Sequence, residues 1–226
     1  MDLKDKVVIV TGALGSLGRA VSAAAVQAGA TVYAVDVVDG QPAEGVTATP
    51  ALDLGDADAT RNAFADIAAK AGRIDALVNV AGGFAWETVD DGSIDIWDHL
   101  YKLNVRTAVN ASKAALPHIP ADGGRIVNIS AAGSVKADMG LGAYAASKSG
   151  VSRLTEALAV ELKSRNITVN AVMPSIIDTA PNRKDMPDAD FSTWVTPAAL
   201  ADVIMFLLSQ RAEAVTGALI PVMGRV

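Results

Sequence analysis

Short apolar runs that alternate with longer helix-patterned segments constrain the fold of this 226-residue chain more than any other feature. Most runs are apolar at every position instead of every second one, as in strands that are covered on both faces. Parallel strands joined by right-handed helical crossovers have this burial, and they form a doubly wound α/β sheet between two helical layers. The runs are Val7–Val10, Thr31–Val35, Ala76–Asn79, Arg125–Ser130, Thr168–Met173 and Ala218–Val222.

Segments with a helical pattern fill the intervals between these predicted strands. Two of them stop at Gly29 and Gly72, and another opens on an N-cap threonine followed by a first-turn proline. A weaker run at Val46–Leu52 contains Pro50, which cannot donate a ladder hydrogen bond and so favours an edge strand. The expected helices are Gly18–Ala28, Asp56–Ala71, Asn104–Leu116, Tyr144–Arg165 and Thr196–Ser209.

Composition narrows the class of protein. With 51% hydrophobic residues and no interdomain linker, residues 1–226 are expected to form one domain with a sizeable core. A net charge of -6 gives no electrostatic support for a nucleic-acid or membrane partner. The chain lacks cysteine, and its two histidines have no acidic ligand pattern nearby, so no metal site is expected. Residues 1–6 lead straight into a strand, and no apolar run reaches the roughly 18 residues of a membrane span, which predicts a cytoplasmic protein.

A turn punctuated by glycines joins the first predicted strand to the first helix. Glycine lets the backbone turn tightly there and leaves room for a pyrophosphate against the helix N-terminus. The second strand is followed by Asp36, whose carboxylate would accept hydrogen bonds from an adenosine ribose and repel a 2′-phosphate. No arginine follows Asp36, so we expect NADH in preference to NADPH as the cofactor. The expected turn residues are Gly12, Gly15, Ser16, Leu17 and Gly18.

Tyr144 and Lys148 lie four residues apart in a predicted helix, so both side chains can point into the same pocket. A free tyrosine has a pKa of about 10, and lowering it by about 3 requires about 4 kcal/mol. A positive charge about 4 Å away supplies about 4 kcal/mol at an effective dielectric of about 20. One lysine is therefore expected to lower the pKa of the phenol enough for proton transfer beside a nicotinamide.

Short motifs follow one another in a fixed order along nearly the whole chain: Thr11–Gly18, Asn79–Gly82, Asn104, Ser130 and Tyr144–Lys148. In this order they resemble the short-chain dehydrogenase/reductase family. The resemblance implies a Rossmann fold and reversible hydride transfer between a nicotinamide and a carbonyl or alcohol carbon. It implies that Tyr144 is the general acid and base, that Ser130 holds the substrate oxygen, and that Lys148 also holds the nicotinamide ribose. Asn104 would support a proton-relay water.

The resemblance also extends the predicted cofactor site to three further segments. Asp53 and Leu54 resemble the pair that flanks the adenine, and Asn79 would brace the sheet while the backbone after it lines the cofactor. A segment after the sixth strand resembles the one that reaches the nicotinamide carboxamide. Two positions depart from the family pattern, since Val80 replaces an asparagine and Ser175 a glycine. The expected residues are Asp53, Leu54, Asn79, Ala81, Gly82, Pro174, Ile177 and Thr179, and Tyr144 and Lys148 are expected to contact the cofactor as well.

The loops around the predicted site suggest a mostly apolar, partly aromatic substrate pocket. Aromatic residues make up only 4% of the chain, so their presence in these loops is informative. For each of these aromatic residues taken separately, burial in the core is as good an interpretation as a place in the substrate pocket. The expected lining consists of Phe84, Trp86, Met139, Leu141, Ser175 and Ile176.

These features favour an NAD(H)-dependent oxidoreductase that interconverts a secondary alcohol and a ketone. One alternative stays open because residues 178–194 and 80–85 resemble quinonoid dihydropteridine reductase, whose family lacks the counterparts of Ser130 and Asn104. A serine that holds a carbonyl oxygen is useful for ketones and dispensable for a quinonoid pteridine, so ketone chemistry ranks first. A second alternative is a non-catalytic nucleotide-binding redox sensor or scaffold. By resemblance, the chain is expected to form a homodimer or homotetramer.

Overall fold

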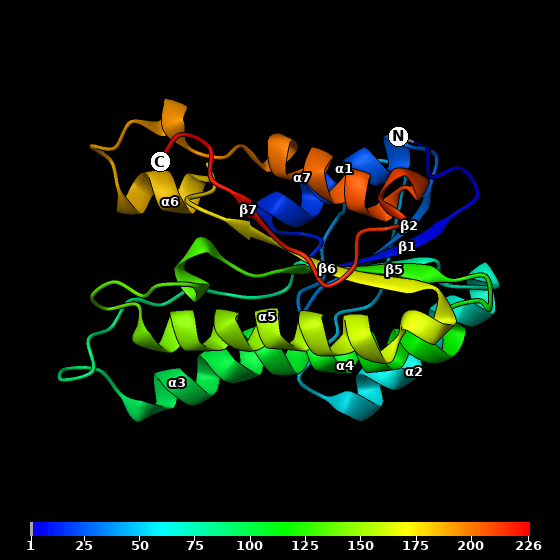
Figure 1. Cartoon of the computed structure of the whole chain (residues 1–226), viewed down its shortest axis with the longest axis horizontal. Helices are drawn as coiled ribbons and strands as arrows, with labels where there is room; N and C mark the ends of the chain where they lie inside the picture. The colour runs from blue at the N-terminus through cyan, green and yellow to red at the C-terminus, as the bar shows by residue number, and fades with distance from the viewer. Residues whose placement is uncertain (1) are drawn as a thin grey trace.

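The computed structural model describes residues 2–226, so Met1 of the expected N-terminal segment lies outside them. Seven parallel strands form the middle layer, in the order β3-β2-β1-β4-β5-β6-β7, with helices on both sides (Figure 1). The order changes direction between β1 and β4, which confirms the predicted doubly wound α/β fold. The strands are β1 (Val7–Thr11), β2 (Thr31–Val35), β3 (Val46–Ala48), β4 (Ala76–Asn79), β5 (Gly124–Ile129), β6 (Ile167–Pro174) and β7 (Leu219–Val222).

The helices form two layers, with α1 and α7 on one face of the sheet and α2, α4 and α5 on the other (Figure 1). A π-helical turn, η1 (Tyr101–Arg106), joins α3 to α4 without a break. Within residues 2–226, no helix has the length and apolar character needed to cross a membrane. The helices are α1 (Ser16–Gln27), α2 (Ala57–Ala71), α3 (Ile94–Leu100), α4 (Thr107–Ala115), α5 (Gly142–Glu161), α6 (Ala180–Asp185) and α7 (Pro197–Leu208), and the 3₁₀ turns are η2 (Leu116–His118), η3 (Ala132–Ser134), η4 (Lys163–Arg165), η5 (Phe191–Thr193) and η6 (Gln210–Ala212).

The structure corrects two of the predicted helix boundaries. The helix expected from Asn104 in fact begins ten residues earlier, at Ile94. The sequence did not reveal this start, because the π-helical turn widens the backbone and interrupts the apolar spacing that marks a regular helix. The helix expected to reach Arg165 ends at Glu161, and the chain leaves η4 through Asn166 in a left-handed conformation. The weak strand forms at the sheet edge, as Pro50 indicated, and stops two residues before it.

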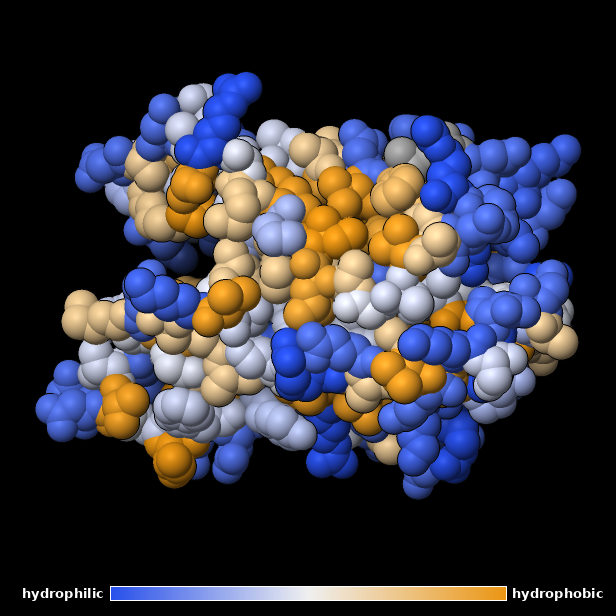
Figure 2. Space-filling view, viewed as in Figure 1, coloured by the Kyte–Doolittle hydropathy of each residue, from blue (hydrophilic) through white to orange (hydrophobic). Residues whose placement is uncertain are grey.

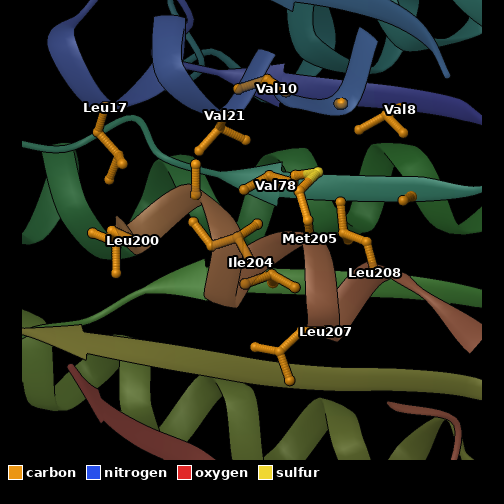
Figure 3. Close-up of a cluster of buried hydrophobic side chains, with 14 of the residues drawn as sticks. Val8, Val10, Leu17, Val21, Val78, Leu200, Ile204, Met205, Leu207 and Leu208 are labelled. Carbon is orange, nitrogen blue, oxygen red and sulfur yellow. The ribbon is translucent and has the colours of Figure 1, made fainter. Parts of the chain in front are cut away.

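Both faces of the sheet carry a dry apolar layer. On one face, branched side chains of β1 and β4 pack against α1 and α7, where Ile204 and Leu207 are fully buried (Figure 3). On the other face, Phe64 of α2 is fully buried against the sheet. Each large side chain buried in this way stabilises the fold by roughly 1.5–3 kcal/mol. These layers account for the uninterrupted apolar runs of the strands.

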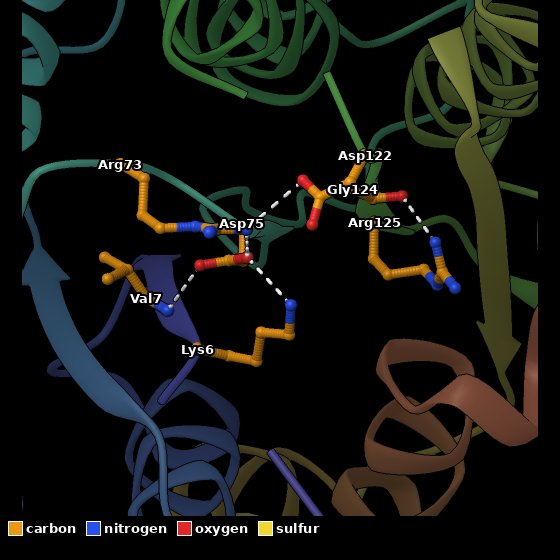
Figure 4. A network of polar contacts seen from close by, with 7 residues as sticks. All are labelled: Lys6, Val7, Arg73, Asp75, Asp122, Gly124 and Arg125. Carbon is orange, nitrogen blue, oxygen red and sulfur yellow. Dashed lines mark hydrogen bonds and ion pairs between the residues drawn. The ribbon is translucent and has the colours of Figure 1, made fainter. Parts of the chain in front are cut away.

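A polar network closes the amino end of the sheet (Figure 4). The Asp75 carboxylate is 4% exposed and accepts hydrogen bonds from the Lys6 ammonium at 3.1 Å and the Arg73 guanidinium at 2.6 Å. It also accepts from the backbone N–H of Val7, the first residue of β1, at 3.0 Å. Since the network lies just before β1 and β4, the carboxyl ends of these strands stay free to form a site.

Candidate active site

A cleft of about 590 Å³ opens at the carboxyl ends of β1 and β4, where the strand order changes direction. Parallel strands end at the same edge of a sheet, so turns that are far apart in the sequence meet there. The first loop, the end of β2, the loop after β3, the loop after β4 and the start of α6 all contribute. Of the residues expected to hold the cofactor, the cleft gathers Gly12, Gly15, Ser16, Leu17, Gly18, Asp36, Asp53, Leu54, Ala81, Gly82 and Thr179.

The three glycines of the first turn have different surroundings. Gly12 has a φ of +60°, and a Cβ on it would lie 2.8 Å from the Ala81 backbone. A Cβ on Gly18 would overlap the carbonyl oxygen of Gly12. Gly15 has only one neighbour within 4 Å of its Cβ position, at 3.4 Å, and it is exposed as the N-cap of α1. Gly12 and Gly18 therefore pack the turn, while Gly15 leaves the helix N-terminus open to an anion.

The Asp36 carboxylate is held by two backbone groups. It accepts from the N–H of Leu14 at 2.9 Å and from the N–H of Val37 at 2.8 Å, so it ties the glycine turn to the end of β2. Val37 and Val38 beside it are 63% and 56% exposed and line the cleft. Of the lining residues that the structure describes, none carries a positive charge. A negative charge with no cation beside it suits ribose hydroxyls better than a 2′-phosphate.

The loop after β3 and the π-helical turn form the far wall of the cleft. Asp53 pairs with Lys102 at 3.4 Å, and the carbonyl of Leu54 accepts from the Asn110 side chain at 2.8 Å. Leu103 and Thr107 line the cleft from η1 and the start of α4. Sequence reasoning missed these two, and the π-helical turn that positions them left no regular spacing to find. The other lining residues that it did not place in the cofactor site are Leu14, Val37, Val38, Leu52 and Val80.

Five expected cofactor residues lie outside the lining of this cleft: Asn79, Pro174 and Ile177, and Tyr144 and Lys148 of α5. The Asn79 side chain is 4% exposed and donates to Ser112 at 3.2 Å and to Asn128 at 2.8 Å, which joins β4 to α4 and β5. These contacts are those of a brace. Pro174 is buried as the last residue of β6, and Ile177 forms a parallel backbone bridge with Val195 and packs against the apolar cluster that includes Leu17.

Tyr144 and Lys148 occupy the first two turns of α5. The Lys148 side chain is 6% exposed, and its ammonium donates to the carbonyl of Ile129 at 2.8 Å. Its Nζ also lies 3.3 Å from the position that a Cβ on Gly82 would take. Because Gly82 lines the cleft, the lysine amine lies directly beneath the loop that borders the expected cofactor.

Burial controls the acidity of both side chains. It raises the pKa of Tyr144 to about 12 and lowers the pKa of Lys148 to about 8. Loss of hydration disfavours the charged form of each group, which moves an acid and a base in opposite directions. The sequence argument counted only the attraction between phenolate and ammonium, so the lowered tyrosine pKa that it predicted is absent from this structure.

Asn104 lies in η1 and is 1% exposed. Its amide oxygen accepts from the N–H of Gly83 at 2.9 Å, and its amide nitrogen donates to the Gly83 carbonyl at 3.1 Å and to Ser147 at 2.9 Å. Ser147 in turn donates to the carbonyl of Tyr144 at 2.8 Å. Asn104 therefore clamps the loop after β4 to the turn of α5 that carries the tyrosine.

Ser130 follows β5 and is 1% exposed. Its hydroxyl donates to the carbonyl of Lys148 at 3.0 Å and lies 2.8 Å from the Ser152 hydroxyl and 3.3 Å from that of Ser134. All three partners belong to α5 and η3. These contacts hold the Ser130 hydroxyl against α5 and η3, and its expected contact with a substrate oxygen stays a prediction.

The expected substrate lining falls into two groups. The ring of Phe84 meets that of Tyr144 edge-on at 4.9 Å, and the Trp86 indole donates to the carbonyl of Met139 at 3.0 Å. The side chains of Phe84, Trp86 and Met139 are more than half exposed. Leu141 is the N-cap of α5. Figure 2 shows this end of the molecule hollowed between α6 and the loop before α5.

Ser175 and Ile176 behave differently from the rest of the expected lining. Ser175 donates to the carbonyl of Met223 at 2.6 Å, and the carbonyl of Ile176 accepts from Val195 at 3.0 Å. Both residues thereby bind neighbouring segments of the chain to the end of β6. Their polar contacts therefore fix the course of the chain just after β6.

Residues 6–190 match the family model of the short chain dehydrogenases. The chain belongs to the short-chain dehydrogenase family. As a short-chain dehydrogenase it is an oxidoreductase that acts on CH–OH or C=O groups. The motif order noted in the sequence, from the glycine turn to Tyr144 and Lys148, falls within the matched residues.

The alignments of this short-chain dehydrogenase with its named relatives span almost the whole chain. It is 33% identical to the 3-oxoacyl-[acyl-carrier-protein] reductase of Thermotoga maritima, over 99% of this chain and 98% of the relative. It is 32% identical to the meso-2,3-butanediol dehydrogenase of Serratia marcescens, over 99% and 95%. Among solved structures, the carveol dehydrogenase of Mycobacterium avium in complex with NAD superposes with a TM-score of 0.88 at 26% identity, covering 98% of this chain and 97% of that one.

Proposed function

We propose that this protein interconverts a secondary alcohol and a ketone with NAD(H). The observation that carries the proposal is the position of Lys148, whose amine lies beneath Gly82 at the cofactor cleft, one helical turn from Tyr144. An acid–base pair thus borders a cleft with an open helix N-terminus. Relatives named as dehydrogenases of butanediol and carveol support the same class of substrate.

The cleft fits a dinucleotide with an unphosphorylated ribose. The exposed Gly15 at the N-terminus of α1 would receive the pyrophosphate, and the Asp36 carboxylate would accept from the adenosine ribose. Lys148 would hold the nicotinamide ribose. Bound NADH supplies the hydride. NADH is preferred over NADPH because the lining offers a fixed carboxylate and no cation for a 2′-phosphate.

Tyr144 performs the proton transfer. With a pKa of about 12, its phenol is protonated at neutral pH, so in reduction it donates a proton to the carbonyl oxygen. In oxidation its phenolate accepts the alcohol proton, which requires that a charged Lys148 stabilise the phenolate. Asn104 holds the tyrosine turn against the loop after β4, and it is the expected support of a relay water.

One observation favours quinonoid dihydropteridine reduction as a second candidate. Reduction of a quinonoid pteridine does not need a serine at a carbonyl oxygen, and the hydroxyl of Ser130 is engaged by α5. The exposed ring of Phe84, 4.9 Å from that of Tyr144, offers an apolar surface to a planar heterocycle. Tyr144 would then donate its proton to a ring nitrogen.

The proposed function is tested by following NADH and NADPH oxidation by the purified protein. Substrates would be aromatic ketones, keto esters, steroids and quinonoid dihydropterin. We expect turnover of a ketone with NADH, and a loss of at least about 10²-fold in Tyr144→Phe with NADH binding retained. Tyr33→Phe, which makes the same change at a tyrosine of β2 packed in the core, is the matched control. Turnover of the pterin alone would replace the first candidate by the second, and full activity of Tyr144→Phe would refute both mechanisms.

The proposal includes a homodimer or homotetramer. Ile94, Trp97 and Tyr101 follow one another at helical spacing, and their side chains are 75%, 36% and 59% exposed. Such an apolar helix face is typical of a surface that a second copy covers.

A further inference from the structure

Three serine hydroxyls meet beneath α5. Ser130 comes from the end of β5, Ser134 from η3 and Ser152 from the middle of α5. The hydroxyls of Ser130 and Ser152 lie 2.8 Å apart, and that of Ser134 lies 3.3 Å from the first and 3.5 Å from the second. Ser130 and Ser152 are 1% and 3% exposed, so their hydrogen bonds form away from water.

The Ser130 hydroxyl has one proton to donate, and the acceptors within its reach are the Lys148 carbonyl and the hydroxyls of Ser134 and Ser152. It donates to the carbonyl of Lys148 at 3.0 Å, and Ser152 also donates to that carbonyl at 3.3 Å. Turning Ser130 toward a substrate would leave the cluster short of a buried donor, which is unfavourable in a dry interior. The next residue, Ala131, is 4% exposed and has no hydroxyl that could substitute.

We propose that Ser130 is a positioning residue that fixes the turn of α5 bearing Lys148, and that Tyr144 holds the substrate oxygen without a serine. This proposal rests on the proposed function for the identity of the reacting oxygen. The hydroxyl of Ser130 acts on the backbone of Lys148, whose amine reaches the cofactor cleft. Loss of that hydroxyl therefore disturbs cofactor binding more than proton transfer.

The arrangement also narrows the substrate class. With Tyr144 as the single side-chain donor, little support is available for negative charge that builds on an isolated carbonyl oxygen. Acceptors that spread this charge themselves, through a neighbouring carbonyl or a conjugated ring, are turned over faster than simple dialkyl ketones. The edge-on ring of Phe84 is compatible with such flat substrates.

Substitution of the serines tests the proposal with and without a substrate. We expect Ser130→Ala to weaken NADH binding several-fold while kcat falls by less than about tenfold, and Ser130→Thr, which keeps the hydroxyl, to restore the affinity. A serine that touches the oxyanion would instead cost about 10²–10³-fold in kcat. That larger loss in kcat with unchanged NADH affinity would overturn the proposal.

A double-mutant cycle supplies a readout that needs no substrate. The stability losses of Ser130→Ala and Ser152→Ala, measured by urea unfolding, are expected to be non-additive because one hydrogen-bonded cluster is lost in both. Ser22→Ala, a buried serine on α1 at the other face of the sheet, is the control and is expected to add to Ser130→Ala. Additive losses of stability for Ser130→Ala and Ser152→Ala would contradict a hydrogen-bonded role of the Ser130 hydroxyl in this cluster. This outcome could be reached even if no substrate were found.

Discussion

Tyr144 and Lys148 share one face of α5, and burial moves their pKa values away from charge in both cases, to about 12 and about 8. At neutral pH the tyrosine is therefore protonated, but a pKa of about 12 makes it a weak acid and leaves little phenolate to act as a base. Carbonyl reduction needs the donor, whereas alcohol oxidation needs the base and so requires a charged lysine beside the phenolate. At the scale of residues, the proposed proton transfer therefore depends on the charge of Lys148.

Lys148 makes the stability of the fold depend on pH. Its pKa is lowered from 10.5 to about 8, so between these values the unfolded chain binds more protons than the folded one. Stability therefore rises with pH across that window, by up to about 3 kcal/mol relative to Lys148→Met. Urea unfolding of both proteins between about pH 7 and pH 10 checks this, because Tyr144, which titrates near pH 10 in the unfolded chain, is present in both proteins.

Lys102→Met is the matched control, since the Lys102 side chain is 55% exposed. It should follow the wild type at every pH. A constant difference in stability between Lys148→Met and the wild type would show that the lysine is not desolvated in solution.

At the scale of elements, the turn before α1 and the π-helical turn η1 shape the cleft. The glycine turn could be predicted, because its spacing is visible in the sequence, but the separate roles of its glycines could not. They depend on the Ala81 backbone and the Gly12 carbonyl, which only the fold brings near. The π-helical turn that buries Asn104 was missed, since it erases the regular spacing of apolar residues.

Two glycine variants separate folding from cofactor binding. Gly15→Ala adds a Cβ whose one neighbour within 4 Å, the Gly12 carbonyl oxygen, lies at an ordinary contact distance of 3.4 Å, so we expect an unchanged melting temperature. We expect weaker NADH binding, because the methyl group occupies the approach of the pyrophosphate. Gly18→Ala forces a Cβ onto the Gly12 carbonyl, so we expect a loss of about 1–3 kcal/mol in the free energy of unfolding. Calorimetric melting and NADH titration distinguish the two; unaltered NADH affinity in Gly15→Ala would argue against a pyrophosphate at this turn.

At the scale of the whole molecule, the two ends of the sheet have different tasks. The amino end is closed by the buried Asp75 between Lys6 and Arg73, and the carboxyl end carries the cleft. The apolar layers on both faces hold the two ends of the sheet in a fixed arrangement, because each layer packs helices against several strands at once.

Loss of Asp75 is expected to destabilise the whole molecule. Asp75→Ala leaves the buried N–H of Val7 without its acceptor, which costs about 1–3 kcal/mol, and it removes the partner of Arg73, whose side chain is 37% exposed. Asp122→Ala, which removes the 69% exposed partner of Arg73, should cost at most about 1 kcal/mol. Denaturant unfolding measures both; equal losses would mean that burial of Asp75 adds nothing to its ion pairs.

The sequence alone determined the parallel sheet, the glycine turn, Asp36 at the end of β2 and the Tyr144 and Lys148 pair, because each depends on spacing along one or two elements. The tertiary structure decided the direction of the Ser130 hydroxyl, the clamp made by Asn104 and the pKa of Tyr144. Hydrogen-bond partners and desolvation depend on all the groups that surround a side chain. Those groups come from distant segments, which only the folded chain brings together.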